Sequence, residues 1–256
     1  MMKFLKKFYL GIIMVFLYVP IVVLIVQSFN AGESRAKWEG FSLHWYAELL
    51  RDERILNALY VTVSIAVIAM IVSTVLGTLA AIGIHAMKKR PQALMMTLTN
   101  LPNTMPDIVT GISLMLLFLF TKVERGYVTM LLAHITFDTP YVILSVLPKL
   151  KQMNRHTYEA ALDLGATPTY ALTRVIIPQC KSGIITGAML AFTLSIDDFT
   201  ISYFTTSPLV QNLSTLIYSS ARKGIDPSLN ALSALMFVAL LVLLLIVNRR
   251  TAEDKS

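Results

Sequence analysis

Six long apolar stretches determine what this chain can fold into. Of its 256 residues, 55% are hydrophobic and 14% are charged, whereas soluble domains carry about a quarter charged residues. A helix that crosses a bilayer needs about 20 mostly apolar residues, because it must satisfy its own backbone hydrogen bonds. We therefore predict an all-α integral membrane protein, a single domain over residues 1–256, with six transmembrane helices at about 8–29, 58–86, 93–121, 127–148, 182–204 and 231–248.

The distribution of lysine and arginine predicts the orientation of these helices. With the N-terminus inside, the inner segments hold 14 and the outer segments 8 of the 22 Lys and Arg residues. The loop at 88–90 is wholly basic, as the positive-inside rule requires. The first stretch lacks a cleavage pattern, so we expect it to remain in the membrane. Both termini are then cytosolic.

Other chemistries receive little support from the composition. The net charge of +7 follows from the orientation bias, so we do not interpret it as nucleic-acid binding. A lone Cys180 cannot form an internal disulfide, and no Cys/His cluster has metal-ligand spacing. We expect no metal and no cofactor bound by this chain.

A polar segment at 149–181 separates the fourth and fifth apolar stretches. Residues 155–164 are good helix formers, and Gly165 follows them, where a helix commonly ends in a left-handed residue. Glu159 and Asp163, spaced i and i+4, place two carboxylates on one helix face. Such a surface in the cytosol is suited to docking a soluble partner.

A second short helix is expected after this glycine turn. Thr167 offers an N-cap oxygen, and Pro168 fits the first helical position, where its missing N–H costs nothing. We predict that this helix runs to about Ile176 and stops near Pro178.

Four aspartates lie inside the predicted membrane helices, which contain no Lys or Arg in their interiors: Asp107, Asp138, Asp197 and Asp198. An ionisable residue near the bilayer centre costs about 2.5–3.5 kcal/mol on insertion scales, so these residues require compensation. The third stretch is also interrupted, because a regular helix cannot continue through both Pro102 and Pro106. Broken backbone at this depth is tolerated where it lines a watery cavity. Asp107 is therefore predicted to face a pathway.

Acidic groups without basic partners suit a cationic substrate. Nearby aromatic side chains can add cation–π contacts to an ammonium group, and the candidates are Phe137, Tyr141, Phe199 and Tyr203. Structural roles stay open: Asp107 can cap the half-helix after Pro106, an aspartate of the fifth helix can bond across a subunit interface, and burial can neutralise a carboxyl.

The polar segment resembles the signature loop of bacterial ABC importer permeases. That pattern is Glu-Ala-Ala, three residues, Gly, nine residues, Ile, one residue, Leu-Pro. This chain supplies Glu159, Ala160, Ala161, Gly165, Val175, Ile177 and Pro178, departing by Val for Ile and Ile for Leu. The resemblance implies the type I importer fold, with a coupling helix that docks in a groove of a separate ATPase subunit. No phosphate loop, Gly-x-x-x-x-Gly-Lys-Ser/Thr, occurs in this chain.

Further motifs along nearly the whole chain resemble the PotC-type spermidine/putrescine permease family: Tyr18-Val19-Pro20-Ile21, Gln27-Ser28-Phe29-Asn30, Pro106-Asp107-Ile108-Val109, His134-Ile135-Thr136-Phe137 and Phe192 to Asp198. This resemblance implies a non-catalytic subunit of a polyamine importer in the bacterial inner membrane. Its partners would be a second, PotB-like permease, two PotA-like ATPases that use ATP and Mg²⁺, and an extracytoplasmic PotD-like binding protein. The alternatives are a permease for another cationic or small solute, and a stand-alone cation carrier or channel, which would not need the 149–181 segment.

Overall fold

The computed structural model describes residues 2–33, 37–154, 156–223 and 227–253. Residue 155 of the predicted coupling segment lies outside these ranges, as do residue 1 and residues 254–256 at the termini. Within these ranges the regular elements are helices, and the only bridges are two isolated ones, Asn30 with Phe41 and Ser207 with Val210. The prediction of an all-α chain is confirmed.

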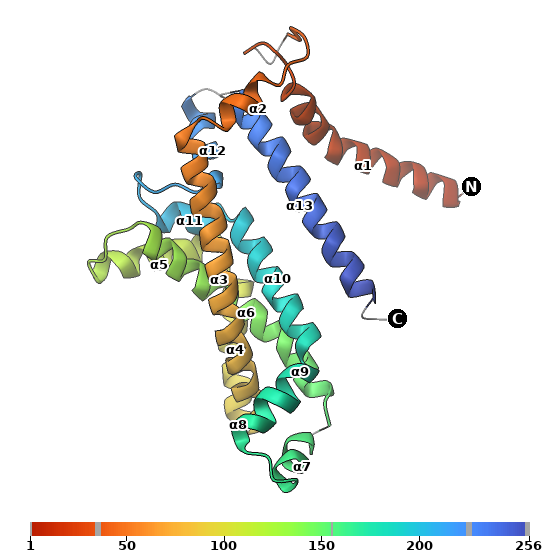
Figure 1. Ribbon diagram of the computed structural model, residues 1–256, viewed down its shortest axis with the longest axis vertical. Coiled ribbons are helices and arrows are strands. Elements are labelled where there is room, and N and C mark those ends of the chain that lie inside the picture. The colour runs from red at the N-terminus through yellow and green to blue at the C-terminus, as the bar shows by residue number, and fades with distance from the viewer. Residues whose placement is uncertain (1, 34–36, 155, 224–226, 254–256) are drawn as a thin grey trace. The chain divides into compact units, whose positions relative to one another are not determined.

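The chain forms two compact units, residues 1–56 with 217–256 and residues 57–216. Unit 1 holds α1 (Met2–Gln27), α2 (His44–Leu49) and α13 (Ser228–Glu253). Unit 2 is built from α3 (Glu53–Ala86, which begins in unit 1), α4 (Lys89–Thr104), α5 (Asp107–Phe120), α6 (Tyr127–Gln152), α7 (Thr157–Asp163), α8 (Pro168–Tyr170), the π-helical η1 (Ala171–Ile176), α9 (Ile177–Gln179), α10 (Lys181–Asp197), α11 (Thr200–Thr205) and α12 (Leu213–Lys223, which ends in unit 1), all drawn in Figure 1.

Three helices are long and apolar enough to cross a membrane, and they fall on the first, second and fourth predicted stretches: Phe8–Gln27, Glu53–Ala86 and Tyr127–Gln152. Two bent pairs pass the same test together, α4 with α5 at 104° and the run Pro168–Gln179 with α10 at 72°. The sixth predicted stretch falls on α13, which is apolar over Ser228–Val242.

The third predicted stretch is broken, as its prolines suggested. Pro102 is accommodated inside α4, and the break falls at Met105 and Pro106. Met105 is extended, with φ −87° and ψ 147°, because a following proline disfavours the helical conformation.

The fifth predicted stretch, 182–204, is not one continuous helix. It ends as α10 at Asp197, and α11 begins at Thr200. Asp198 between them is extended, with φ −65° and ψ 126°. Sequence periodicity could not reveal this break, because both sides are apolar and residues 188–204 contain no proline or glycine.

Glycines allow α3 and α10 to approach α6 closely. A Cβ added at Gly77 of α3 would lie 2.6 Å from Val142 Cβ, and one at Gly187 of α10 would lie 3.0 Å from Val142 Cα. At Gly183 it would lie 2.8 Å from the backbone oxygen of Ser145. Small residues four positions apart are the usual means of close helix packing in membranes.

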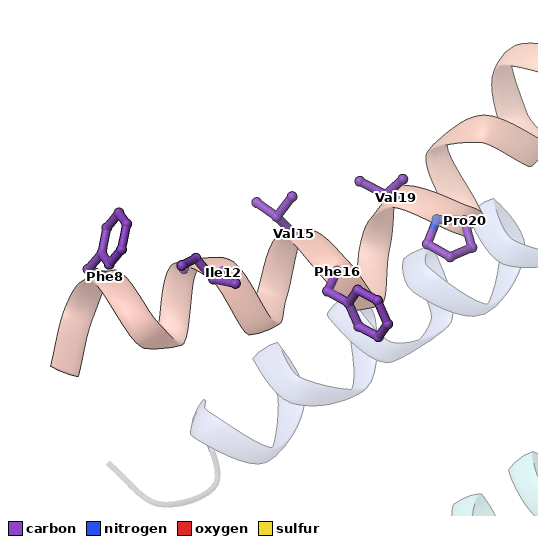
Figure 2. A pocket seen from close by; sticks show the side chains of 7 residues that line it. Phe8, Ile12, Val15, Phe16, Val19 and Pro20 are labelled. Atoms are coloured by element: carbon purple, nitrogen blue, oxygen red, sulfur yellow. The ribbon is translucent and has the colours of Figure 1, made fainter. Parts of the chain in front are cut away.

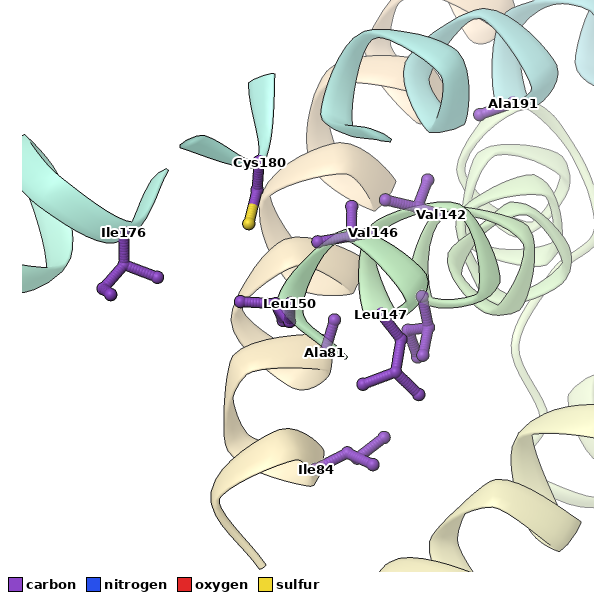
Figure 3. Packing of buried hydrophobic residues seen from close by; sticks show 10 residues of the cluster. Ala81, Ile84, Val142, Val146, Leu147, Leu150, Ile176, Cys180 and Ala191 are labelled. Atoms are coloured by element: carbon purple, nitrogen blue, oxygen red, sulfur yellow. The ribbon is translucent and has the colours of Figure 1, made fainter. Parts of the chain in front are cut away.

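An apolar cluster surrounds the C-terminal half of α6, and Figure 3 shows its side chains on α3, α6, α10 and the helical run before α10. Its buried members are Ala81, Ile84, Val142, Ile143, Val146, Leu147, Leu150, Ile176, Cys180 and Ala191. The polar segment is thus anchored in the core at its C-terminal end.

Unit 1 contains a loop held by a side-chain hydrogen bond and a helix, α1, with many exposed apolar side chains. Trp45 and Leu49 of α2 are buried, and Trp45 Nε1 donates to the backbone oxygen of Asn30 at 2.7 Å. Along α1, the side chains seen in Figure 2, from Phe8 to Pro20, border an apolar hollow of about 810 Å³. Phe16 there is 78% exposed. A face of this kind is suited to contact with lipid or another membrane helix.

Candidate functional site

The glycine turn after α7 has the predicted local structure. Gly165 is left-handed, with φ +87°. Its N–H donates to Leu162 O at 2.9 Å, and the N–H of Ala166 donates to Ala161 O at 3.1 Å. These two bonds are the Schellman pattern, which satisfies the last carbonyls of a helix. The turn is therefore specified by residues within five positions of one another.

The second helix begins and ends close to the predicted positions. The N–H of Tyr170 donates to Thr167 Oγ1 at 3.3 Å, and Pro168 occupies the first helical position. The prediction that the helix stops near Pro178 is confirmed, because the helical run ends at Gln179. The wider π-helical turn of η1 precedes Pro178, which stands in the first turn of α9, where a proline needs no donor.

The tip formed by α7, the turn and α8 exposes apolar and acidic groups together. Leu164 is 90% exposed and Tyr170 57%. Both border a hollow of about 470 Å³, which the small residues Ala161, Gly165 and Ala166 keep open. In Figure 1 this tip lies at one end of unit 2. We name these residues, 157–170, the coupling tip.

The predicted carboxylates of the coupling tip are accessible. Glu159 and Asp163 are exposed, as is Ala160. The imidazole Nδ1 of His156 lies 2.9 Å from Glu159 Oε2. The pair sits at the surface, so its contribution to stability is small.

The four aspartates separate into exposed and buried groups. Asp107 is exposed at the first position of α5, and Asp197 is exposed at the end of α10. Asp138 on α6 is fully buried. Asp198 is nearly so, with 8% of its side chain exposed.

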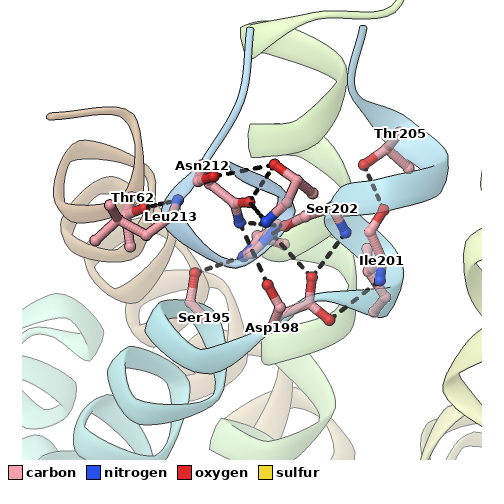
Figure 4. A network of polar contacts seen from close by, with 10 residues as sticks. Thr62, Ser195, Asp198, Ile201, Ser202, Thr205, Asn212 and Leu213 are labelled. Atoms are coloured by element: carbon pink, nitrogen blue, oxygen red, sulfur yellow. Dashed lines mark hydrogen bonds and ion pairs between the residues drawn. The ribbon is translucent and has the colours of Figure 1, made fainter. Parts of the chain in front are cut away.

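Asp198 caps α11 and belongs to a polar network, which Figure 4 shows. Its carboxylate accepts the N–H of Ile201 at 3.1 Å and of Ser202 at 2.7 Å. His134 Nε2 of α6 lies 3.5 Å from the same carboxylate. Oxygens satisfied by backbone donors explain why a buried carboxylate is tolerated here. These partners all belong to this chain, whereas a bond across a subunit interface was one of the roles left open.

His134 connects three elements through this network. Its Nδ1 bonds Ser195 Oγ of α10 at 2.5 Å, and its Nε2 bonds Ser202 Oγ of α11 at 2.9 Å. Asn212 Nδ2 also donates to Ser202 Oγ at 2.8 Å. Sequence reasoning did not identify these residues as a group. The available signal was the spacing of His134 and Asp138, which lie one turn apart on α6.

The aromatic candidates lie in two pairs beside the aspartates. The rings of Phe137 and Tyr141 are 5.3 Å apart, and those of Phe199 and Tyr203 are 5.4 Å apart. Asp107 and Asp138 both lie within electrostatic range of Tyr141. Tertiary structure therefore gathers the predicted acidic and aromatic residues from α5, α6 and the α10–α11 break. Within the described ranges, no group of three or more His, Cys, Asp or Glu could hold a metal ion.

Solved structures share this fold. It superposes with a TM-score of 0.75 and 17% identity on a bacterial ABC transporter involved in the import of the acidic polysaccharide alginate, covering 98% of this chain and 96% of that one. The MetNI methionine ABC transporter gives a TM-score of 0.66 at 13% identity, covering 84% of this chain and 100% of that one. These similarities show the fold of an ABC importer permease.

Residues 73–250 match the family described as binding-protein-dependent transport system inner membrane component. The chain belongs to this family of membrane-spanning permeases, which are non-catalytic transport subunits.

Curated relatives cover most of its length. It is 38% identical over 231 residues to the putrescine transport system permease protein PotI of Escherichia coli K12, covering 88% of this chain and 82% of the relative. It is 34% identical to the spermidine/putrescine permease protein PotC of the same strain, covering 99% and 96%. The Haemophilus influenzae PotC is 32% identical, covering 96% and 97%. The resemblance to PotC-type permeases is confirmed.

Proposed function

We propose that this chain is the permease subunit of an ATP-driven importer that moves polyamines, spermidine or putrescine, into the cytoplasm. The observation that carries the proposal is its identity of 34–38% to PotC and PotI over most of its length. The gathered aspartates support it, because their carboxylates can attract a polycation.

The proposal includes the arrangement in the membrane. The chain works as one permease domain with six spans, in the bacterial inner membrane, and its termini and the 149–181 segment are cytosolic. It pairs with a second, PotB-like permease, two PotA-like ATPases and a PotD-like binding protein. ATP and Mg²⁺ are used by the ATPases, and this chain binds no cofactor or metal.

The coupling tip is the proposed ATPase contact. Leu164 and Tyr170 present apolar surface around the 470 Å³ hollow, and burial of such side chains is the main source of binding energy at an interface. Glu159, Ala160, Ala161 and Asp163 form the α7 side of this surface, and Gly165 sets its turn. We assign the ATPase as the partner of the tip because the chain carries the family's signature spacing from Glu159 through Pro178.

Movement of the tip can reach the membrane helices through packed side chains. Ile176 and Cys180 belong to the same buried cluster as Val146 and Leu150 of α6. A displacement at the ATPase is therefore passed to α6 and α10 as a rigid-body tilt. ATP binding would open the pathway outward to the binding protein, and hydrolysis would reset it inward.

The proposed pathway begins at the exposed aspartates. Asp107 and Asp197 are accessible in this arrangement, and Tyr203, which is 44% exposed, stands beside Phe199. These groups suit an ammonium cation by charge and by cation–π contact. Asp138, Tyr141 and Asp198 come into contact with substrate only after α10 and α11 separate from α6.

Reconstitution of the whole complex tests this function. Uptake of labelled spermidine into proteoliposomes should require ATP and the binding protein. Excess putrescine should compete, and monoamines and metal cations should not. Uptake that proceeds without the ATPase would indicate a stand-alone carrier, and competition by an unrelated solute alone would assign the permease to that solute.

A further inference from the structure

The buried carboxyl of Asp138 has no partner within the described part of the chain. The side chain is 0% exposed, and no donor in the described residues reaches either of its oxygens. An ionised carboxylate without hydrogen bonds or a counter-ion in such a place carries a large free-energy cost, and such groups usually take up a proton instead.

The neighbouring carboxyl, that of Asp198, has hydrogen-bond donors. Asp198 accepts two backbone N–H groups and lies 3.5 Å from His134 Nε2, so it is stabilised as an anion. Asp198 also lies within electrostatic range of Asp138. Two close carboxyls resist ionising together. The negative charge therefore rests on the acid that has donors.

Other titratable groups around Asp138 do not supply a positive counter-charge. His134 lies one turn away on α6, but its ring nitrogens face Ser195, Ser202 and Asp198, so a positive charge on the ring would pair with Asp198. Tyr141, one turn away on α6, is an uncharged neighbour within electrostatic range of Asp138. Within the described ranges, no Lys or Arg forms an ion pair with Asp138. A second subunit cannot reach the side chain either, because this chain covers it completely.

We propose that Asp138 is a proton-binding site, occupied in this closed arrangement of α6, α10 and α11, and that its proton leaves when these helices separate. The step is a simple acid dissociation: the carboxyl O–H breaks, the carboxylate keeps the electron pair, and water in the opened pathway accepts the proton. By linkage, the open form binds fewer protons, so raising the pH favours opening by up to about tenfold per pH unit. The site does not depend on which solute is carried, so it can hold even if the polyamine proposal fails.

Infrared spectroscopy of the assembled complex in lipid nanodiscs tests occupancy directly. Wild-type complex at pH 7 should show a carbonyl stretch of a protonated carboxylic acid, and isotope labelling of aspartate should shift this band. Asp138→Asn, which mimics the neutral acid in shape, should remove it. Asp52→Asn, in the outer loop beside Arg54, is the matched control and should leave it unchanged.

The wild-type measurement needs no substitution, so absence of the band remains decisive if Asp138→Asn fails to assemble. Absence of a protonated aspartate band from the wild-type complex at pH 7 would overturn the proposal, since it would show an ionised side chain held by internal water or a bound cation. Persistence of the band in well-assembled Asp138→Asn would overturn it as well.

A second measurement tests the link to opening. Distances between probes at Leu132 of α6 and Leu190 of α10, both exposed, would be followed from pH 6 to pH 9 in the nucleotide-free complex. The opened fraction should rise with pH in the wild type and stay constant in Asp138→Asn. Equal pH dependence in both proteins would refute the coupling of this proton to opening.

Discussion

The coupling tip and the aspartate cluster, both in unit 2, are built in opposite ways. The aspartate cluster comprises Asp138 and Asp198 with His134, Ser195 and Ser202. In the tip, Leu164 is 90% exposed, and the bonds that shape the turn join residues at most five positions apart. In the cluster, Asp138 is fully buried, and hydrogen bonds join residues 61 and 68 positions apart, with His134 at their centre. A surface made for a partner can be encoded locally, whereas a buried polar site requires the whole bundle.

This difference predicts how each region responds to mutation. A change in the cluster's packing should disturb assembly, because α6, α10 and α11 share it. A change at the tip should disturb coupling and leave the fold intact.

The largest effect is expected for Gly183→Val. The new Cβ would lie 2.8 Å from the backbone oxygen of Ser145, and overpacking of this kind costs about 1–3 kcal/mol or more. We expect a lower thermal midpoint of the purified complex and loss of assembled protein. Gly83→Val, where an added Cβ meets nothing within 4 Å, is the control, and equal losses in both variants would contradict the close-packing role.

Gly165→Val should produce the next largest effect. A β-branched residue in a left-handed conformation costs about 1–2 kcal/mol, which is sufficient to rebuild the turn. We expect uptake to fall about tenfold while ATP hydrolysis continues, with the complex still assembled. Parallel measurements of uptake and hydrolysis would check this.

Gly40→Val provides the matched control for that strain. Gly40 is also left-handed, with φ +122° and open space around it, but it lies in the loop before α2 of unit 1. It should leave the ratio of uptake to hydrolysis unchanged. If Gly40→Val uncoupled the two as strongly as Gly165→Val, strain in general would explain the result and the tip would lose its special role.

Leu164→Ala should weaken ATPase association without altering the fold. The side chain is almost fully exposed, so stability should change by less than about 0.5 kcal/mol, while loss of a buried contact in the complex should reduce affinity about tenfold. Titration with purified ATPase subunit measures this. Leu209→Ala, which is 95% exposed elsewhere in unit 2, should not change ATPase affinity, and unchanged binding by Leu164→Ala would remove the tip from the interface.

Asp107→Asn is expected to give the smallest change. The exposed carboxylate contributes charge to the proposed pathway, so uptake should fall a few-fold, with a loss of about 0.5–1 kcal/mol of attraction for the cation. Uptake should fall further in Asp198→Asn, because this substitution also removes the charge-assisted cap of α11. Initial rates of spermidine uptake would rank the two, and wild-type kinetics in both would refute the pathway role.

The local features were predictable from sequence for a physical reason. Gly165, Thr167 and Pro168 each act through their own backbone geometry or through a hydrogen bond a few residues away. The break at Pro106 was equally predictable from the sequence, because a proline restricts the backbone of the residue before it. The end of the helical run near Pro178 was predictable for the same reason, whereas the π-helical turn of η1 was not predicted.

Sequence by itself determined the class of this protein: apolar length required membrane helices, the spacing around Gly165 identified the permease family, and the excess of aspartate over basic residues in the helices indicated a cationic solute. Only the tertiary structure decided which aspartate is capped, which is exposed and which is buried without a partner. The protonation and accessibility of an acid depend on donors and covering atoms, and here these come from helices far apart in the chain. No periodicity within one helix carries that information.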